Sequence, residues 1–249
     1  MAVHRTVRAV DDVDEALTII TLDRPSRRNA LDHATLTELK AVLDGALDRP
    51  TRALVLTGSD GHFCAGADLT GVEDAAFTDL LQAVLDRLRD VPFPTIAAIE
   101  GAALGAGTQL AVACDLRVAA ADASFGIPAA RLGLMVNHWT VQRTATMLGP
   151  SAARAVLLAA EVVSGADAHR LGLVNRQGVL TDAIDWAESI SRLAPLTIAG
   201  HKLMLNRLEA PIPDDPVVRD AFEQAWKSED FAEGIEAFRA RRTPQFRGR

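Results

Sequence analysis

The sequence has few cysteines, no excess of basic residues and no long apolar run, and each absence excludes a class of protein. Its two cysteines, Cys64 and Cys114, are too few for a disulfide framework and lack the C-x-x-C spacing of many metal sites. The formal net charge is −7, whereas general nucleic-acid and membrane-surface binding need a basic face. No apolar run reaches the ~18 residues that span a bilayer, and residues 1–5 lack the apolar core of a signal peptide. We therefore expect a cytoplasmic protein with inert thiols that binds no nucleic acid and inserts into no membrane.

The 249 residues, 49% of them hydrophobic, are enough to bury a full core. Short apolar or β-branched runs predict strands over residues 17–22, 53–57, 95–99 and 116–119. Longer helical patterns separate them, including a helix over 32–47 capped by Asp32 and a helix that begins after Gly105. Repeated strand–helix units indicate a sheet covered by helices. After Pro195 only helical segments follow, over 196–208, 216–227 and 229–241.

Two runs of small residues, 63–68 and 101–115, each follow an apolar segment. The second run opens a helix, and a helix start offers free N–H groups with a partial positive charge. Together the runs are able to present two backbone N–H groups to one ligand oxygen. The spacing of Gly101, Gly105 and Gly107 does not match a dinucleotide-binding fingerprint. The alternative is that both runs are tight turns that allow close helix packing.

The order and separation of these runs resemble the enoyl-CoA hydratase/isomerase superfamily, also called the crotonase family. Further matches lie at residues 24–25, 28–31, 54–58, 94–98, 125–128 and 171–174, so the resemblance runs from about Thr18 to Phe246. It implies an α/β fold, with a crotonase-type spiral of ββα units that carries an acyl-CoA site over residues 1–195. It also implies a helical C-terminal oligomerisation region over 196–249 that builds homotrimers, in some members paired into hexamers.

The resemblance assigns the N–H groups of Ala67 and Ala106 to an oxyanion hole for the thioester oxygen of a fatty acyl-CoA. Coenzyme A then enters as part of the ligand, and no permanently bound cofactor is expected. In hydratases of the family two glutamates act as acid and base, and their positions here hold Gln109 and Ala129. An amide and a methyl group cannot transfer that proton, and each such group is typically worth about 10²–10⁴ in rate. We therefore expect the usual hydration to be weak or absent.

Other members of the family carry an acid further along the second wall, where this chain has Asn137 followed by His138 and Trp139. Histidine is the residue type best suited to proton transfer at physiological pH, so His138 is the best candidate for residual proton transfer. The alternative is that Asn137 caps a helix that begins near Trp139, while His138 faces solvent or packs. Trp139 is then a wall for an acyl chain or an ordinary core residue. Asp68 is either a pocket carboxylate or, as we favour, a turn residue.

The resemblance also points to groups that contact coenzyme A. Arginine suits phosphate contacts, and the matched positions are Arg27, Arg28, the backbone of Ala65, Asp68 and Leu69, and in the tail Phe222 and Arg241. For Arg241 a solvated basic chain end is an equal alternative. Glu73 and Glu100 lie off the family's catalytic positions and are interpreted as solvated or turn-stabilising. The histidines show no metal-ligand spacing, so no metal site is predicted.

Two functions are consistent with these residues. The first is a protein of fatty-acid metabolism that binds an acyl-CoA for carriage, sensing or delivery to another lipid enzyme, with little turnover. The second is an active enoyl-CoA hydratase, isomerase or other acyl-CoA thioester enzyme that uses His138, Asp68 or a bound water. We favour the first, because Gln109 and Ala129 stand beside an intact pair of oxyanion motifs.

Overall fold

The computed structural model describes residues 1–70, 75–208 and 215–249, and the contacts within it divide the chain into two compact units. Unit 1 contains residues 1–125 and 164–209, and unit 2 contains residues 126–163 and 210–249. By these contacts residues 196–208 go with unit 1, whereas the expected functional division at 195/196 stays a prediction. No helix in the described ranges is both long and apolar enough to cross a membrane.

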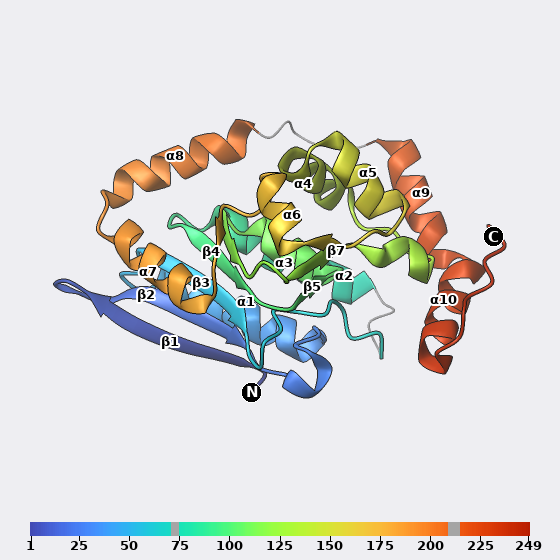
Figure 1. The fold of residues 1–249 in the computed structure, drawn as a ribbon, viewed down its shortest axis with the longest axis horizontal. Helices are drawn as coiled ribbons and strands as arrows, with labels where there is room; N and C mark the ends of the chain where they lie inside the picture. The colour runs from blue at the N-terminus through green and yellow to red at the C-terminus, as the bar shows by residue number, and fades with distance from the viewer. Residues whose placement is uncertain (71–74, 209–214) are drawn as a thin grey trace. The chain divides into compact units, whose positions relative to one another are not determined.

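A six-stranded sheet forms the centre of unit 1 (Figure 1). Its strands, in spatial order, are β1 (Val3–Val10), β2 (Val13–Leu22), β3 (Ala53–Gly58), β4 (Thr95–Ile99), β6 (Leu116–Ala119) and β9 (Arg176–Gln177). The hairpin of β1 and β2 is antiparallel, and every later pair is parallel. The four strands predicted from apolar runs are confirmed. Three shorter strands, β5 (Ala102–Leu104), β7 (Ser124–Gly126) and β8 (Val163–Ser164), form a second sheet.

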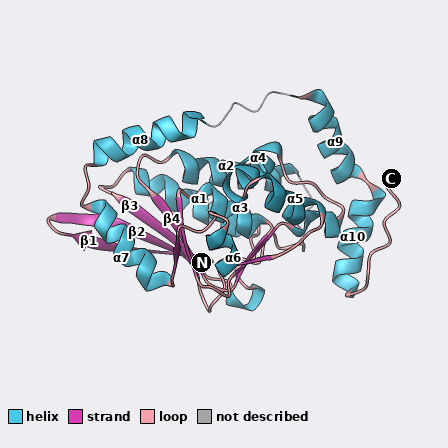
Figure 2. Ribbon diagram, turned by 45° about the horizontal axis from the view of Figure 1, so that its top comes forward, coloured by secondary structure: helices cyan, strands magenta, loops and turns pink. Residues whose placement is uncertain are grey.

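Helices cover both faces of the six-stranded sheet (Figure 2). The helices of unit 1 are α1 (His33–Leu47), α2 (Ala75–Asp90), α3 (Ala106–Ala113), α6 (Gly165–Arg170), α7 (Leu180–Ser191) and α8 (Pro195–Leu208). The predicted cap of α1 is present, since the Asp32 carboxylate accepts the Thr35 N–H at 2.8 Å. Consecutive β3 residues Leu54, Val55 and Leu56 are all fully buried. Parallel strands covered on both sides require such continuous apolar runs.

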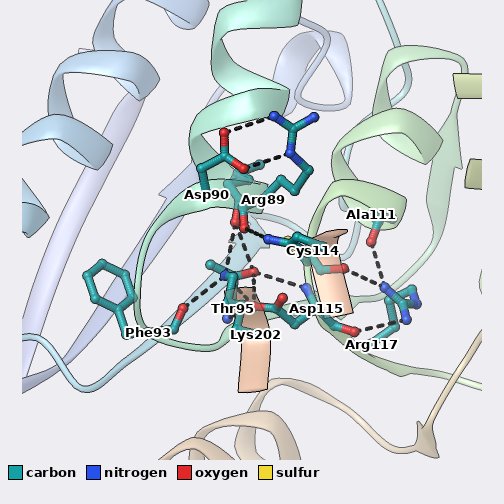
Figure 3. Close-up of polar contacts among 11 residues, drawn as sticks. Arg89, Asp90, Phe93, Thr95, Ala111, Cys114, Asp115, Arg117 and Lys202 are labelled. Carbon is teal, nitrogen blue, oxygen red and sulfur yellow. Dashed lines mark hydrogen bonds and ion pairs between the residues drawn. The ribbon is translucent and has the colours of Figure 1, made fainter. Parts of the chain in front are cut away.

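Helix α8 docks through polar side chains (Figure 3). The Lys202 ammonium, 7% exposed, lies 2.6 Å from Asp115 Oδ2 and donates to the Phe93 carbonyl at 3.0 Å. Asp115 Oδ2 also accepts the Thr95 N–H at 2.8 Å. Ile198 packs against the core, but five other large apolar side chains of the helix are exposed, namely Leu196, Leu203, Met204, Leu205 and Leu208. The helix therefore exposes an apolar surface of the kind that usually faces a core.

Unit 2 contains the short helix η2 (Pro128–Leu132) with α4 (His138–Leu148), α5 (Pro150–Leu158), α9 (Pro216–Lys227) and α10 (Glu229–Ala240). The predicted tail helices are confirmed. Main chains approach closely here, because a Cβ on Gly234 would lie only 2.4 Å from the Leu132 carbonyl oxygen. The Trp226 indole donates to the Met135 carbonyl at 2.9 Å. These contacts fix the segment after η2 against the C-terminal helices.

Candidate functional site

The segment that contains the first small-residue run lies between two other stretches of main chain in unit 1. On one side, Cys64 donates its N–H to the Ala102 carbonyl at 2.8 Å, and its own carbonyl accepts the Leu104 N–H at 3.0 Å. On the other side, the Ala65 N–H donates to the Arg28 carbonyl at 2.9 Å. The two small-residue runs, 63–68 and 101–115, are therefore direct neighbours in the structure.

Leu31 determines where the Ala67 N–H points. The Gly66 carbonyl accepts the Leu31 N–H at 2.8 Å, and the Leu31 carbonyl accepts the Asp68 N–H at 2.7 Å. The Gly66 C=O and the Ala67 N–H belong to one peptide group, and none of the described peptide bonds is cis. In a trans peptide these two bonds point in opposite directions. The Ala67 N–H therefore points away from Leu31, and no hydrogen bond joins it to the described residues.

The second N–H lies at the start of α3. The Gly105 carbonyl accepts the Gln109 N–H at 3.1 Å inside the helix, so the Ala106 N–H of the same peptide points out of the helix. It too has no hydrogen-bond partner among the described residues. The loops touch, because a Cβ on Gly66 would lie 3.7 Å from the Ala106 nitrogen. Two unpaired N–H groups thus stand on adjacent loops.

Glycine is required at this junction for two reasons. Gly66 has φ +109° and Gly105 has φ +54°, a backbone region that residues with a side chain rarely adopt. A Cβ on Gly107 would lie 2.2 Å from the Cys64 carbonyl oxygen, far inside contact distance. The tight turns and close helix packing of the alternative interpretation are therefore present. They occur in the same loops that expose the N–H groups of Ala67 and Ala106, so the two interpretations are compatible.

The two positions that match catalytic glutamates lie in different units. Gln109 is on α3, one turn after Ala106, and is 7% exposed. Ala129 is on η2 in unit 2. Neither side chain has a proton that titrates near neutrality.

Asp68 makes an ion pair inside unit 1. Its carboxylate, 9% exposed, accepts from the Arg24 guanidinium at 3.0 Å and from the Thr70 hydroxyl at 2.6 Å. Burial would raise the pKa of the Asp68 carboxyl, but the hydrogen bonds from Thr70 and Arg24 outweigh it, and the pKa lies below its ordinary value. A carboxylate that stays ionised in this way is poorly suited to donate a proton near neutrality, which is consistent with the turn-residue interpretation.

Some of the residues expected around coenzyme A are exposed, and others already make hydrogen bonds within the chain. Arg27 and Arg28 are exposed at the end of the short helix η1 (Pro25–Arg27), and Arg28 has a left-handed conformation. The N–H groups of Ala65 and Asp68 are used within the chain. Contact of these two residues with a ligand through the main chain is therefore left to their carbonyls. Leu69 is partly buried beside them.

In unit 2, Asn137 caps α4, because its side chain accepts the Thr140 N–H at 2.9 Å. His138 is exposed at the first position of that helix. Trp139 is partly buried, and its indole N–H is shielded from solvent without a hydrogen-bond partner within the described chain. This arrangement is the one expected if Asn137 acts as a cap.

The remaining residues named from the sequence are two positions in the C-terminal helical region and two glutamates near the small-residue runs. Phe222 contacts Trp226 through their rings, with centroids 6.0 Å apart. Arg241 is exposed and ends α10 in a left-handed conformation. Glu73 lies outside the described residues, and Glu100 contributes its carbonyl to the Phe63 N–H. No group of three or more His, Cys, Asp or Glu in the described ranges is arranged to hold a metal ion.

Both thiols are buried, Cys64 in the first small-residue run and Cys114 at the C-terminal end of α3. Burial raises the pKa of Cys64 and of Cys114 to about 12, so neither forms a thiolate near neutrality.

Comparison with known proteins identifies the family. The sequence matches the enoyl-CoA hydratase/isomerase family over residues 12–249. The chain belongs to this family. It is 43% identical over 235 residues to the Mycobacterium tuberculosis protein named probable enoyl-CoA hydratase echA6, covering 94% of this chain and 97% of that protein. It is 35% identical to the human mitochondrial enoyl-CoA hydratase domain-containing protein 2, covering 98% and 89%.

Solved structures agree at the level of the fold. Enoyl-CoA hydratase from Bacillus anthracis is 28% identical with a TM-score of 0.77 and 100% coverage of both chains. Methylmalonyl-CoA decarboxylase is 22% identical with a TM-score of 0.89, covering 100% of this chain and 99% of that one. The α/β spiral with C-terminal helices, expected from the resemblance, is therefore the fold of this family member.

Sequence patterns did not mark two residues that hold the junction together. Arg24 and Asn29 both lie in segments that match the family, but the sequence patterns assigned neither residue a role of its own. Yet the buried Asn29 amide donates to the carbonyls of Ser59 and His62, and its oxygen accepts the Arg24 N–H. The bonds to Ser59 and His62 join residues 30 and 33 positions apart, so no local pattern predicts them.

Proposed function

We propose that this family member binds a fatty acyl-CoA and holds its thioester carbonyl between the N–H groups of Ala67 and Ala106, with little or no hydration. The observation that carries the proposal is the pair of unpaired N–H groups on touching loops. Donors of this kind polarise a carbonyl without needing to reorganise. Names of relatives support an acyl-CoA ligand, since one solved structure is methylmalonyl-CoA decarboxylase in complex with 2-nitronate-propionyl-CoA.

Binding without hydration follows from the side chains at the two glutamate positions. Hydration needs a base to activate water and an acid to protonate the α-carbon. The buried amide of Gln109 is able to bond a ligand or a water, but it has no useful pKa near neutrality. The methyl side chain of Ala129 has no polar group. A polarised but unreacted thioester suits carriage, sensing or delivery to another lipid enzyme.

A panel of saturated and 2-unsaturated acyl-CoAs of graded chain length tests the proposal, with binding and product followed in the same samples. We expect saturated acyl-CoAs to bind and 2-enoyl-CoAs to bind without being consumed. Rapid formation of 3-hydroxyacyl-CoA by the purified protein would overturn it.

The second candidate is an active enoyl-CoA hydratase, isomerase or other thioester enzyme, and the names of the 43% and 35% identical relatives favour it. It requires proton transfer by His138, Asp68 or a bound water. His138 is exposed, and the pKa of Asp68 is lowered. If the panel detects turnover, the variants His138→Ala and Asp68→Asn distinguish these sources, because the responsible group must lower kcat when removed.

We also infer a homotrimer or a dimer of trimers. The exposed apolar side chains of α8 support this, since a neighbouring subunit would cover Leu196, Leu205 and Leu208. Analytical ultracentrifugation of the wild type and of Leu205→Glu tests it. We expect a trimer or hexamer that the charged side chain dissociates, and a monomeric wild type would contradict the inference.

A further inference from the structure

We propose that Arg24 is a positioning residue that orients the Ala67 N–H toward the ligand oxygen, an inference that rests on the proposed function. Arg24 makes no hydrogen bond to Ala67 in the structure. It acts through Leu31, the residue that fixes the direction of the Gly66–Ala67 peptide group.

The guanidinium of Arg24 holds the residues on both sides of Leu31. Its Nη1 donates to the Ala30 carbonyl at 2.5 Å, and its Nη2 lies 3.0 Å from Asp32 Oδ2. Asp32 is in turn fixed as the N-cap of α1 by Thr35. Leu31 is fully buried between them. The position of Leu31 is therefore set by one arginine and one helix start.

The same guanidinium also holds the residue beyond Ala67. Its Nη2 donates to Asp68 Oδ2 at 3.0 Å, while the Asp68 N–H donates to the Leu31 carbonyl at 2.7 Å. Arg24 thus contacts both of the hydrogen-bonded segments, 30–32 and 66–68. A rotation of the Gly66–Ala67 peptide would have to break the bond from Leu31 to Gly66 first.

Only an arginine fits these acceptors. One carbonyl and two carboxylates lie around a single planar group, a geometry that a lysine ammonium on a flexible stem does not reproduce. The side chain is 21% exposed and Asp68 is 9% exposed, so the pair is partly withdrawn from solvent. Hydrogen bonds to charged groups in such surroundings are shorter and stronger than neutral ones.

A merely structural ion pair and a positioning residue differ in what they do to the bound thioester. Infrared difference spectroscopy of an acyl-CoA labelled with ¹³C at the thioester carbonyl reports polarisation directly. We would compare the wild type with Arg24→Gln, Arg24→Lys and Asp68→Asn. The matched control is Arg87→Gln, which removes an ion pair with Asp44 on α1 and α2.

In the wild type and in Arg87→Gln we expect the carbonyl band to move to lower frequency on binding. In Arg24→Gln we expect it to return most of the way to its position in free acyl-CoA, with affinity falling roughly three- to tenfold, the loss of about one hydrogen bond. Arg24→Lys keeps the positive charge but lacks the two terminal nitrogens of the guanidinium. Its carbonyl band should therefore lie at a frequency close to that of Arg24→Gln. Asp68→Asn tests the same link if Arg24→Gln does not fold, and it should shift the band in the same direction.

The outcomes separate the two proposals. A wild type that binds acyl-CoA without any band shift would overturn the proposed oxyanion hole. A normal wild-type shift that persists unchanged in folded Arg24→Gln, or in Asp68→Asn, would overturn the role of Arg24 alone.

Discussion

The Lys202 ammonium and the Asp115 carboxylate form a 2.6 Å ion pair that joins α8 to the end of α3 and the start of β6 (Figure 3). Replacing Lys202 by Met leaves Asp115 and the Phe93 carbonyl without their buried donor. We expect the free energy of unfolding to fall by about 3 kcal/mol, the scale for breaking a buried pair. Urea denaturation measures this. Lys227→Met is the control, since its pair with Glu223 is exposed and its loss should leave the midpoint unchanged.

Ala106→Pro removes one proposed donor with little other change. Ala106 is the first residue of α3, a position where proline is well tolerated because that N–H has no helical partner. We expect a folded protein whose affinity for acyl-CoA is roughly three- to tenfold weaker, measured by isothermal titration calorimetry. Ala106→Gly keeps the N–H and should bind nearly as the wild type does. Equal binding by both variants would exclude this N–H as a donor.

Gly107→Ala should disrupt the packing of α3 on the first loop. The added Cβ would lie 2.2 Å from the Cys64 carbonyl oxygen, so main chain has to move. We expect a loss of about 2–3 kcal/mol in the free energy of unfolding and a parallel loss of acyl-CoA binding. Gly45→Ala in α1 meets nothing within 4 Å and should instead stabilise the protein by about 0.5–1 kcal/mol. In thermal unfolding, the melting temperature should fall for Gly107→Ala and rise for Gly45→Ala.

Placing carboxylates at both glutamate positions tests the proposal that proton transfer is what this protein lacks. If only proton transfer is missing, Gln109→Glu combined with Ala129→Glu should raise the rate of 3-hydroxyacyl-CoA formation at least about 10²-fold. Each single variant should do much less, because acid and base are both required. A double variant that binds acyl-CoA normally but hydrates no faster than the wild type would show that more than proton transfer is absent.

The C-terminal residues depend on the charge of Glu233. The Arg242 guanidinium and the Gln245 N–H both donate to this carboxylate, which lowers the pKa of Glu233 to about 2. Because the folded pKa is below the ordinary value of 4.5, the contribution to stability is complete above about pH 4.5 and is lost as the pH falls toward 2. Carbon-13 NMR of the Glu233 carboxyl should show it still ionised at pH 3.5. A midpoint near 4.5 would contradict the contacts described for this chain end.

Local patterns predicted much of the fold because a parallel strand covered on both faces has a continuous apolar run in its sequence. The limits of β4 and β6 match the predicted ones. The strand predicted over 17–22 begins earlier, at Val13, which pairs with Val10 of β1, and the polar residues Asp14 and Glu15 break the apolar run before Leu17. β1 itself was not predicted. Its charged residues Arg5 and Arg8 suit an exposed edge, and edge strands lack a strong apolar signal.

The candidate site was predictable where its parts are local and not where they are distant. The small-residue runs pointed to main-chain donors, and the family resemblance assigned them to Ala67 and Ala106, whose N–H groups have no partner among the described residues. Arg24 lies 44 residues from Asp68, and nothing in the sequence around either residue indicates the other. The cap at Asn137 is local, with its partner three residues away, and was anticipated as one of two alternatives.

All eight residues of α3 are buried, so the peptide that starts this helix is held by close packing on its C-terminal side. Heat capacity should record that rigidity. In a calorimetric series of saturated acyl chains, each added methylene should contribute an equal negative increment, because only the ligand's own surface changes its hydration. An upward or downward break in that series would mark the length at which the chain leaves its protein enclosure.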